Sequence, residues 1–241
     1  RVLPKVMRRV EAVRLWRLAS ERPTTRRLAE MPTRFAEVRQ PLTRYVAIPT
    51  VCSERRRFVP MAYLEPDVIA SNQVYVLPDA GLAEFGILSS TMHNAWIRCT
   101  CGRLKSDFRY SAGIVYNNFP WPNIVNSVPK TASKALADQL IPALAASENI
   151  ANKKTAEAVV KLIAKIEAAA QAVLDARAAH QQPGAFSTLA QLYDPITMPA
   201  NLAKAHAALD TMVDAAYKED GGATSYANDG ERVAFLFKRY A

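Results

Sequence analysis

Four charged residues alternate along one short segment of the chain. Arg103, Lys105, Asp107 and Arg109 are separated by single residues, so in an extended strand their side chains would project from one face. Lys and Arg can donate hydrogen bonds to guanine O6 and N7, and Asp can accept one from cytosine N4. The segment therefore has the chemistry to recognise base pairs in the major groove of DNA. By pattern alone, a charged surface strand with cross-strand pairs is the stronger interpretation.

The cysteines and histidines do not form a recognisable metal site. Cys99 and Cys101 with His93 make only a partial ligand set, because structural zinc needs four ligands at defined spacing and Cys52 is distant. We expect the three cysteines to be buried structural thiols. Their odd number does not make a disulfide framework and is typical of a reducing compartment, so a cytoplasmic location is expected.

Motifs for independent catalysis are missing from the sequence. None of His93, His180 and His206 accompanies a nucleophile motif such as Gly-x-Ser-x-Gly, and we interpret the last two as surface or packing residues. There is neither a P-loop nor a Gly-x-Gly-x-x-Gly motif. Residues 117–121, Asn-Asn-Phe-Pro-Trp, superficially resemble the Asn-Pro-Pro-aromatic loop of amino-methylating DNA methyltransferases, but no proline follows the asparagine directly. We assign no catalytic residue and no cofactor site to this chain.

The positive charge is concentrated in the first half of the sequence. Residues 1–126 contain 19 Lys and Arg against 10 Asp and Glu, whereas residues 127–241 contain 12 of each, which accounts for the whole net charge of +9. A localised basic field attracts polyanions, and the planar guanidinium of arginine suits phosphates and base edges. Surface arginines are usually solvated, so charge alone favours nucleic-acid binding only slightly. No apolar run approaches the roughly 20 residues of a membrane span, so no membrane partner is expected.

Hydrophobic periodicity and breaks predict the elements that position the charged segment. Apolar residues at three- and four-residue spacing (Val6, Val10, Val13, Trp16) predict an amphipathic helix from Pro4 to about Ser20. The chain begins at Arg1 without an initiator methionine, so we expect a piece of something longer. A short helix is expected at Arg26–Glu30 and a longer one at Ala83–Cys101. Three strands of one antiparallel sheet are expected at Tyr45–Val51, Arg57–Tyr63 and Gln73–Leu77. Gly102–Ser111 is expected to be extended, and the two prolines in Asn117–Pro122 predict an extended segment or a rigid turn.

The composition changes after Pro122. Residues 127–241 contain 30 alanines, against 11 in residues 1–126, and few strand formers, which indicates a helical bundle. We therefore predict an α+β fold with two domains. Residues 1–126 would form a small antiparallel sheet with helices, and residues 127–241 an all-α domain. Its expected helices are Ala132–Ser147, Lys153–His180, Ala200–Tyr217 and Glu231–Tyr240.

A paired motif resembles one known family. The segment Cys101–Ser111, Cys-Gly-Arg-Leu-Lys-Ser-Asp-Phe-Arg-Tyr-Ser, is followed by Ile114–Pro122, Ile-Val-Tyr-Asn-Asn-Phe-Pro-Trp-Pro. Together they closely resemble a motif of the MmeI-like DNA methyltransferases. In that family one chain joins a nuclease, a helical spacer, an adenine-N6 methyltransferase domain, a target recognition domain and a helical C-terminal domain. Similarity extends through Arg26–Ala29, Phe35–Pro41, Leu192–Pro195, Met198–Pro199, Ala205–His206, Leu209–Asp210, Val213–Tyr217 and Glu231–Phe237.

The resemblance implies roles for particular residues. Lys105 and Asp107 match two positions that act as a pair to choose one base pair of the target, and lysine on guanine with aspartate on cytosine would specify G·C. Arg109 and Gln73 are similar to further specificity positions. The implied phosphate contacts, which position without specifying, are Arg55, Arg56, Arg57 and Arg103.

Two hypotheses about function follow. The preferred one is a non-catalytic, sequence-specific double-stranded DNA recognition module. It would belong to a parent chain that binds S-adenosylmethionine and methylates adenine, with the methyltransferase domain of that chain as its second partner. The alternative is a non-enzymatic scaffold that binds a partner protein through the alanine-rich helices. A stable complex of the helical part with a partner, with the basic half dispensable, would favour the alternative.

Overall fold

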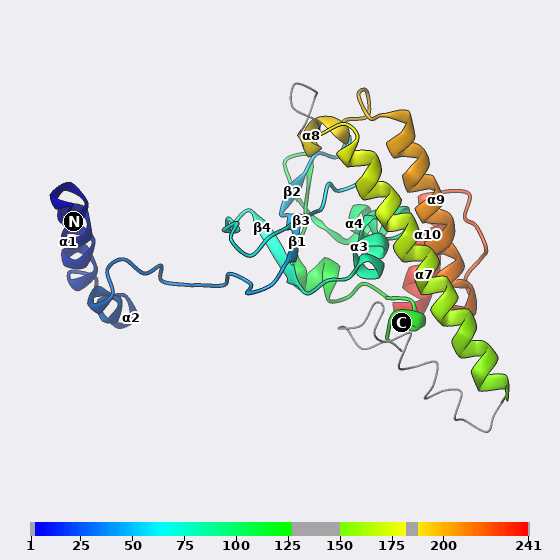
Figure 1. The fold of residues 1–241 in the computed structure, drawn as a ribbon, viewed down its shortest axis with the longest axis horizontal. Helices are drawn as coiled ribbons and strands as arrows, with labels where there is room; N and C mark the ends of the chain where they lie inside the picture. Colours follow the sequence, from blue (N-terminus) through cyan, green and yellow to red (C-terminus); the bar gives the residue numbers. More distant parts are fainter. Residues whose placement is uncertain (1–2, 127–149, 182–187, 241) are drawn as a thin grey trace. The chain divides into compact units, whose positions relative to one another are not determined.

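The protein is described by a computed structural model over residues 3–126, 150–181 and 188–240. It divides into two compact units, residues 1–40 and residues 41–241 (Figure 1). None of the helices in the described part of the chain combines the length and apolar character needed to cross a membrane.

The first unit is a small helical arrangement. It contains α1 (Pro4–Leu18), α2 (Pro23–Arg27) and the 3₁₀ turn η1 (Leu28–Glu30), and both α-helices begin at a proline. The two predicted helices are thus confirmed, with the second starting three residues earlier than expected. The predicted apolar stripe is not buried within this unit, since Ala29 is the only buried residue among those described here. The unit is held instead by Arg17, whose guanidinium donates to the carbonyls of Leu28, Met31 and Arg34 at 2.7–2.9 Å.

An antiparallel sheet opens the second unit. It contains β1 (Tyr45–Pro49), β3 (Ala62–Leu64) and β4 (Val74–Pro78) in the order β3-β1-β4. The first and third predicted strands are confirmed within two residues. The middle prediction, Arg57–Tyr63, is wrong before Ala62. There Pro60 lacks a donor for a sheet ladder, and Val59 donates its N–H to Asn94 Oδ1 at 2.8 Å instead.

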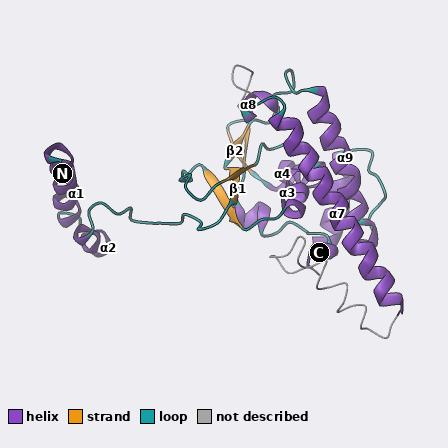
Figure 2. Ribbon diagram, viewed as in Figure 1, coloured by secondary structure: helices purple, strands orange, loops and turns teal. Residues whose placement is uncertain are grey.

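A second, smaller sheet carries the charged segment. Strand β2 (Val51–Cys52), β6 (Asp107–Arg109) and β5 (Gly102–Leu104) pair antiparallel in the order β2-β6-β5. The chain passes directly from β1 into β2, so one continuous stretch contributes to both sheets (Figure 2).

The long helix predicted for Ala83–Cys101 is two helices. Helix α3 (Leu82–Ser89) and α4 (Thr91–Thr100) are separated at Ser90, whose backbone is extended, with φ −77° and ψ 163°. The Ser90 hydroxyl caps α4 by accepting the N–H of His93. The carboxylate of Asp210 accepts from both the N–H and the hydroxyl of Thr91, at 2.6 and 2.5 Å. These bonds satisfy the first turn of α4 and therefore stabilise the break.

Helices dominate the rest of the chain. A π-helical turn, η2 (Ala112–Tyr116), precedes the irregular segment Phe119–Pro122 and then α5 (Asn123–Asn126). Three of the predicted C-terminal helices are confirmed, while Ala132–Ser147 lies outside the described residues. The C-terminal elements are α7 (Ile150–Ala178), α8 (Leu189–Leu192), α9 (Ala200–Ala216), η3 (Lys218–Asp220) and α10 (Asp229–Tyr240).

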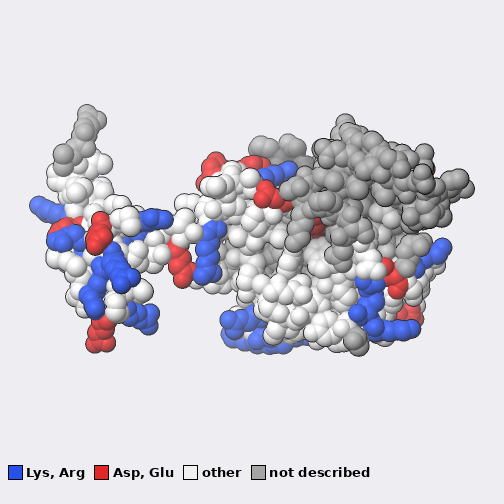
Figure 3. Space-filling view, turned by 90° about the horizontal axis from the view of Figure 1, so that it is seen from below, with Lys and Arg blue, Asp and Glu red and all other residues white. Residues whose placement is uncertain are grey.

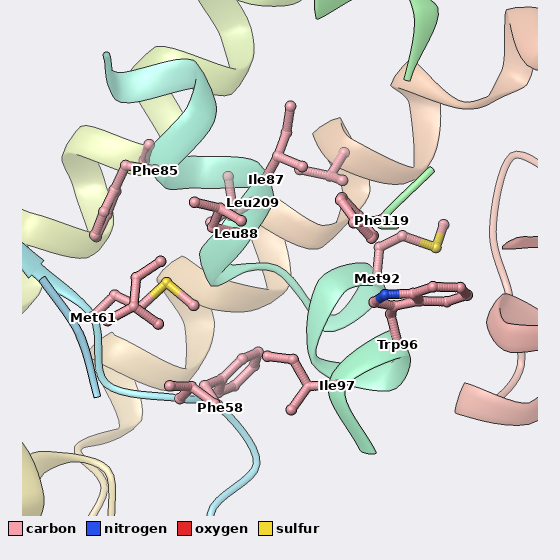
Figure 4. Packing of buried hydrophobic residues seen from close by; sticks show 14 of the residues in the cluster. Phe58, Met61, Phe85, Ile87, Leu88, Met92, Trp96, Ile97, Phe119 and Leu209 are labelled. Carbon is pink, nitrogen blue, oxygen red and sulfur yellow. The ribbon is translucent and has the colours of Figure 1, made fainter. Parts of the chain in front are cut away.

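Among the described residues of the second unit, a buried cluster extends from Val46 to Leu236 and joins strands to helices, which confirms the α+β class. Side chains of α3 and α4 lie among Phe58 and Met61 from the sheet side and Leu209 from α9 (Figure 4). Helix α3 crosses both α7 and α9 at Gly86. A Cβ there would lie 3.1–3.2 Å from atoms of Ala170, Ile166 and Leu209. The absence of a side chain at Gly86 is therefore what allows the three helices to approach so closely.

Candidate nucleic-acid interface

The charged segment is a hairpin rather than one extended strand. Gly102 pairs with Arg109, Arg103 with Phe108 and Leu104 with Asp107, and the chain reverses at Lys105 and Ser106. Cross-strand partners share a face of a sheet, so Arg103 lies with Phe108 on one face, whereas Leu104, Asp107 and Arg109 share the other. The prediction that all four charged residues share one face is therefore wrong. The cause is the turn, which reverses the alternation.

The outer face and the tip of the hairpin present unpaired charges. Lys105 is exposed at the tip with φ +57°, Arg109 is exposed, and Asp107 is half-buried. Within the described part of the chain, none of these three residues takes part in an ion pair. Their charges are therefore not neutralised internally, and a donor and an acceptor lie at the same end of the hairpin.

Arg103 is engaged within the hairpin. Its guanidinium lies 4.2 Å from the centre of the Phe108 ring and donates to the Ser106 carbonyl at 2.8 Å. It also lies 3.5 Å from a carboxylate oxygen of Glu54. These contacts stabilise the turn, so Arg103 supports the conformation in which Lys105 is displayed.

Thr50 links Gln73 to the charged hairpin. The N–H and the hydroxyl of Thr50 donate to the Gln73 carbonyl at 2.9 and 3.0 Å, and the Thr50 carbonyl accepts the N–H of Tyr110 at 2.9 Å. The structure thereby places the exposed Gln73 beside the end of β6, where Arg109 lies. Thr50 is not predictable as part of the site, because a threonine after a strand carries no local sign that it joins two sheets.

The three consecutive arginines lie in the loop after β2, and their environments differ. Arg55 and Arg57 are exposed, whereas Arg56 is half-buried and donates from Nη2 to the carbonyl of Ala190 at 3.3 Å. Lys and Arg side chains gather in patches on both units in the view of Figure 3. Of the three arginines in this loop, Arg55 and Arg57 therefore have the side chains best placed to meet a polyanion.

The thiols differ from expectation at one position. Cys52 is buried and Cys101 half-buried, and burial raises the pKa of each thiol, which disfavours the reactive thiolate. Cys99 is exposed on α4, so the prediction of three buried thiols is wrong there. All three are free. Within the described ranges, no group of three or more His, Cys, Asp or Glu residues is placed to hold a metal ion.

Two of the histidines are neutral packing residues. Burial lowers the pKa of His93 and of His206 to about 3. His93 Nε2 lies 3.2 Å from the hydroxyl of Tyr110, and His206 Nε2 lies 2.7 Å from that of Tyr193. The third, His180, is exposed. The interpretation of His180 and His206 as surface or packing residues is thus confirmed.

Comparison with known proteins identifies the family. Residues 1–123 match the model of the MmeI target recognition domain, and residues 160–241 match that of the MmeI C-terminal domain. The chain therefore belongs to the MmeI family and contains its target recognition and C-terminal domains.

Two longer proteins resemble nearly the whole chain. It is 33% identical to DNA methyltransferase A of Bacillus subtilis (strain 168) over 98% of its own length and 22% of that protein. It also resembles the solved structure of the Type IIL restriction-modification enzyme MmeI in complex with DNA. There the TM-score is 0.72 and the identity 38%, over 98% of this chain and 26% of that one. The chain thus spans about a quarter of these relatives or less.

Proposed function

We propose that this chain is the sequence-specific double-stranded DNA recognition module of a site-specific DNA methyltransferase in a restriction-modification system. The observation that carries the proposal is the exposed hairpin tip of a target recognition domain, where Lys105 and Asp107 lie two residues apart without ion-pair partners among the described residues. A relative of the same fold is known in complex with DNA.

The proposed recognition divides base contacts from phosphate contacts. Lys105 donates to guanine O6 or N7, and Asp107 accepts from the N4 amino group of the paired cytosine, which together select G·C. Arg109 and Gln73, which the hydrogen bonds of Thr50 bring close together, would contact further bases. Phosphate contacts come from Arg55 and Arg57, with Arg56 and Arg103 contributing to the same basic field while also supporting the loop and the hairpin.

The parent chain would supply the chemistry. We propose that it methylates adenine at N6 with S-adenosylmethionine in the cytoplasm. Its methyltransferase domain would be the second partner of this module, and a fused nuclease is compatible with the family. None of the cofactor-binding residues is assigned to this chain. Within it, we propose that residues 1–126 recognise the target and that residues 127–241 brace the recognition surface.

Methylation-site sequencing tests the assignment of Lys105 and Asp107. DNA from cells that express the full-length parent is compared with DNA from cells that express the double variant Lys105→Glu, Asp107→Arg. Exchanging the donor and the acceptor should change one base pair of the methylated motif from G·C to C·G. An unchanged motif would remove these two residues from base recognition and mean that specificity lies elsewhere in residues 44–110.

A further inference from the structure

The backbone at Arg57 is connected to the last helix through the side chain of Arg98. The carbonyl of Arg57 accepts a hydrogen bond at 2.8 Å from Nη1 of Arg98, which lies on α4. The same guanidinium donates from Nε and Nη2 to Asp229 Oδ2, at 2.9 and 2.5 Å. Asp229 is the first residue of α10. One guanidinium therefore connects the start of the last helix to the loop that carries Arg55, Arg56 and Arg57, called the arginine loop.

Further contacts with the C-terminal helices hold the residues that follow Arg57. Phe58 stacks on the His206 ring of α9, with ring centroids 4.0 Å apart. The Met61 carbonyl accepts from Nη1 of Arg177 on α7, at 2.7 Å. Arg56 also donates to the Ala190 carbonyl of α8. Residues 56–61 thus contact α7, α8 and α9 directly and α10 through Arg98, and each of these contacts joins residues more than 100 positions apart in the sequence.

Asp229 fixes the direction in which the planar guanidinium of Arg98 points. When Asp229 engages Nε and Nη2, Nη1 is left pointing at the Arg57 carbonyl, because the five N–H groups form a rigid fork. An amide at position 229 would keep at most one weaker acceptor and no charge. Arg98 would then be free to rotate, and the Arg57 carbonyl would lose a fixed donor.

We propose that Asp229 is a positioning residue for DNA binding, which acts through Arg98 to hold the loop that presents Arg55 and Arg57 to the phosphates. This inference rests on the proposed function, in which those two arginines contact the DNA backbone. The C-terminal helices would then determine how the chain meets the phosphates without touching a base.

The salt dependence of DNA affinity separates positioning from stability. The association constant K falls as the salt concentration rises, and each phosphate contact adds about 0.9 to the magnitude of the slope of log K against log salt concentration. The binding of the full-length parent to a fluorescent duplex that carries its methylated motif measures this slope. Asp229→Asn should lower the magnitude of the slope by about 1 to 2 and leave the methylated motif unchanged. A variant that merely unfolds in part would weaken Kd by one factor at every salt concentration. Asp229→Glu should recover part of the lost slope.

Two further variants make the test specific. Asp220→Asn breaks a different ion pair of the C-terminal part, the one between Asp220 and Arg239 at 2.8 Å. Arg239 donates to the carbonyl of Trp121 and not to the arginine loop, so this variant should leave the slope unchanged. In a background of Arg55→Gln with Arg57→Gln, the slope should already be low and Asp229→Asn should not lower it further. An unchanged slope for Asp229→Asn, when the double arginine variant does lower it, would overturn the positioning role. If the double arginine variant leaves the slope unchanged, the phosphate role in the proposed function is itself wrong.

Discussion

Lys105 occupies a backbone conformation that favours glycine. Its φ of +57° lies in the left-handed region, which costs a residue with a Cβ about 1–2 kcal/mol, and lysine has no special tolerance for it. Within the described residues, the Lys105 side chain takes part in no ion pair that would offset this cost. A strained residue that displays a free charge is typical of a binding position.

Replacing Lys105 by glycine should separate folding from recognition. We expect Lys105→Gly to change the free energy of unfolding by less than about 1 kcal/mol, because relief at positive φ offsets the greater entropy of glycine in the unfolded chain. Discrimination at one base pair should fall by about 5- to 150-fold, the equivalent of 1–3 kcal/mol. Urea unfolding and methylation-site sequencing of the parent measure the two effects. Asp79→Gly, at φ +56°, is the matched control and should leave the motif intact.

The residue types at the recognition surface could be predicted from the sequence, but their faces could not. Alternation of charge pointed to residues 103–109, and a family motif pointed to Lys105 and Asp107 as a pair. The reversal at Lys105 and Ser106 was not predictable, since this pair is not the Asn-Gly or Asp-Gly pair that signals a two-residue hairpin turn. Arg103 was consequently placed on the wrong face. The contact of Thr50 with Gln73 spans 23 residues and leaves no local pattern either.

At the scale of elements, the crossing of α3 with α7 and α9 depends on Gly86. We expect Gly86→Ala to destabilise the chain by about 1–3 kcal/mol, because the new Cβ would lie 3.1–3.2 Å from three buried side-chain atoms and force the helices apart. Thermal or urea unfolding measures the change. Gly113→Ala is the control, since a Cβ there meets nothing within 4 Å, and it should be neutral or slightly stabilising. A neutral Gly86→Ala would show that the helices relax at this crossing.

Helices with strong periodicity were predictable and their interruption was not. Helices α1, α7, α9 and α10 follow from alanine content and apolar spacing. The break at Ser90 depends on Asp210, which contacts Thr91 across 119 residues of sequence, so only the folded chain shows it. The second strand was overestimated because apolar, β-branched residues around Pro60 serve the buried cluster rather than a sheet.

At the scale of the molecule, buried polar groups connect the sheets to the helical part. The buried cluster includes Val46 of β1 and Leu236 of α10, so apolar packing is continuous from the first strand to the last helix. Within it, Arg177 joins Met61 to Tyr193, and Tyr193 in turn contacts His206. Composition indicates that the second half is helical, but it does not show which of its polar residues turn inward.

The buried histidines should make the whole fold sensitive to mild acid. The pKa of His93 and of His206 is about 3 in the folded chain, lowered chiefly by burial from an ordinary value of 6.5. Between those values the unfolded chain binds protons that the folded chain does not. The free energy of unfolding therefore has its full value above about pH 6.5 and decreases as the pH falls toward 3. Each histidine should cost about 1.4 kcal/mol per pH unit below 6.5.

Two buried carboxyls oppose this loss at lower pH. Burial raises the pKa of Asp210 and of Asp214, so the folded chain takes up their protons before the unfolded chain does, which stabilises it as the pH falls. The histidine effect should therefore be clearest just below pH 6.5. Urea unfolding should show that the free energy of unfolding is roughly 3 kcal/mol lower at about pH 5.5 than at about pH 7. In His93→Gln this difference between the two pH values should be roughly half as large, whatever the stability of that variant at pH 7. Stability that is constant or rises between these pH values would mean that the two imidazoles accept protons without unfolding, and that the packing around them opens to water.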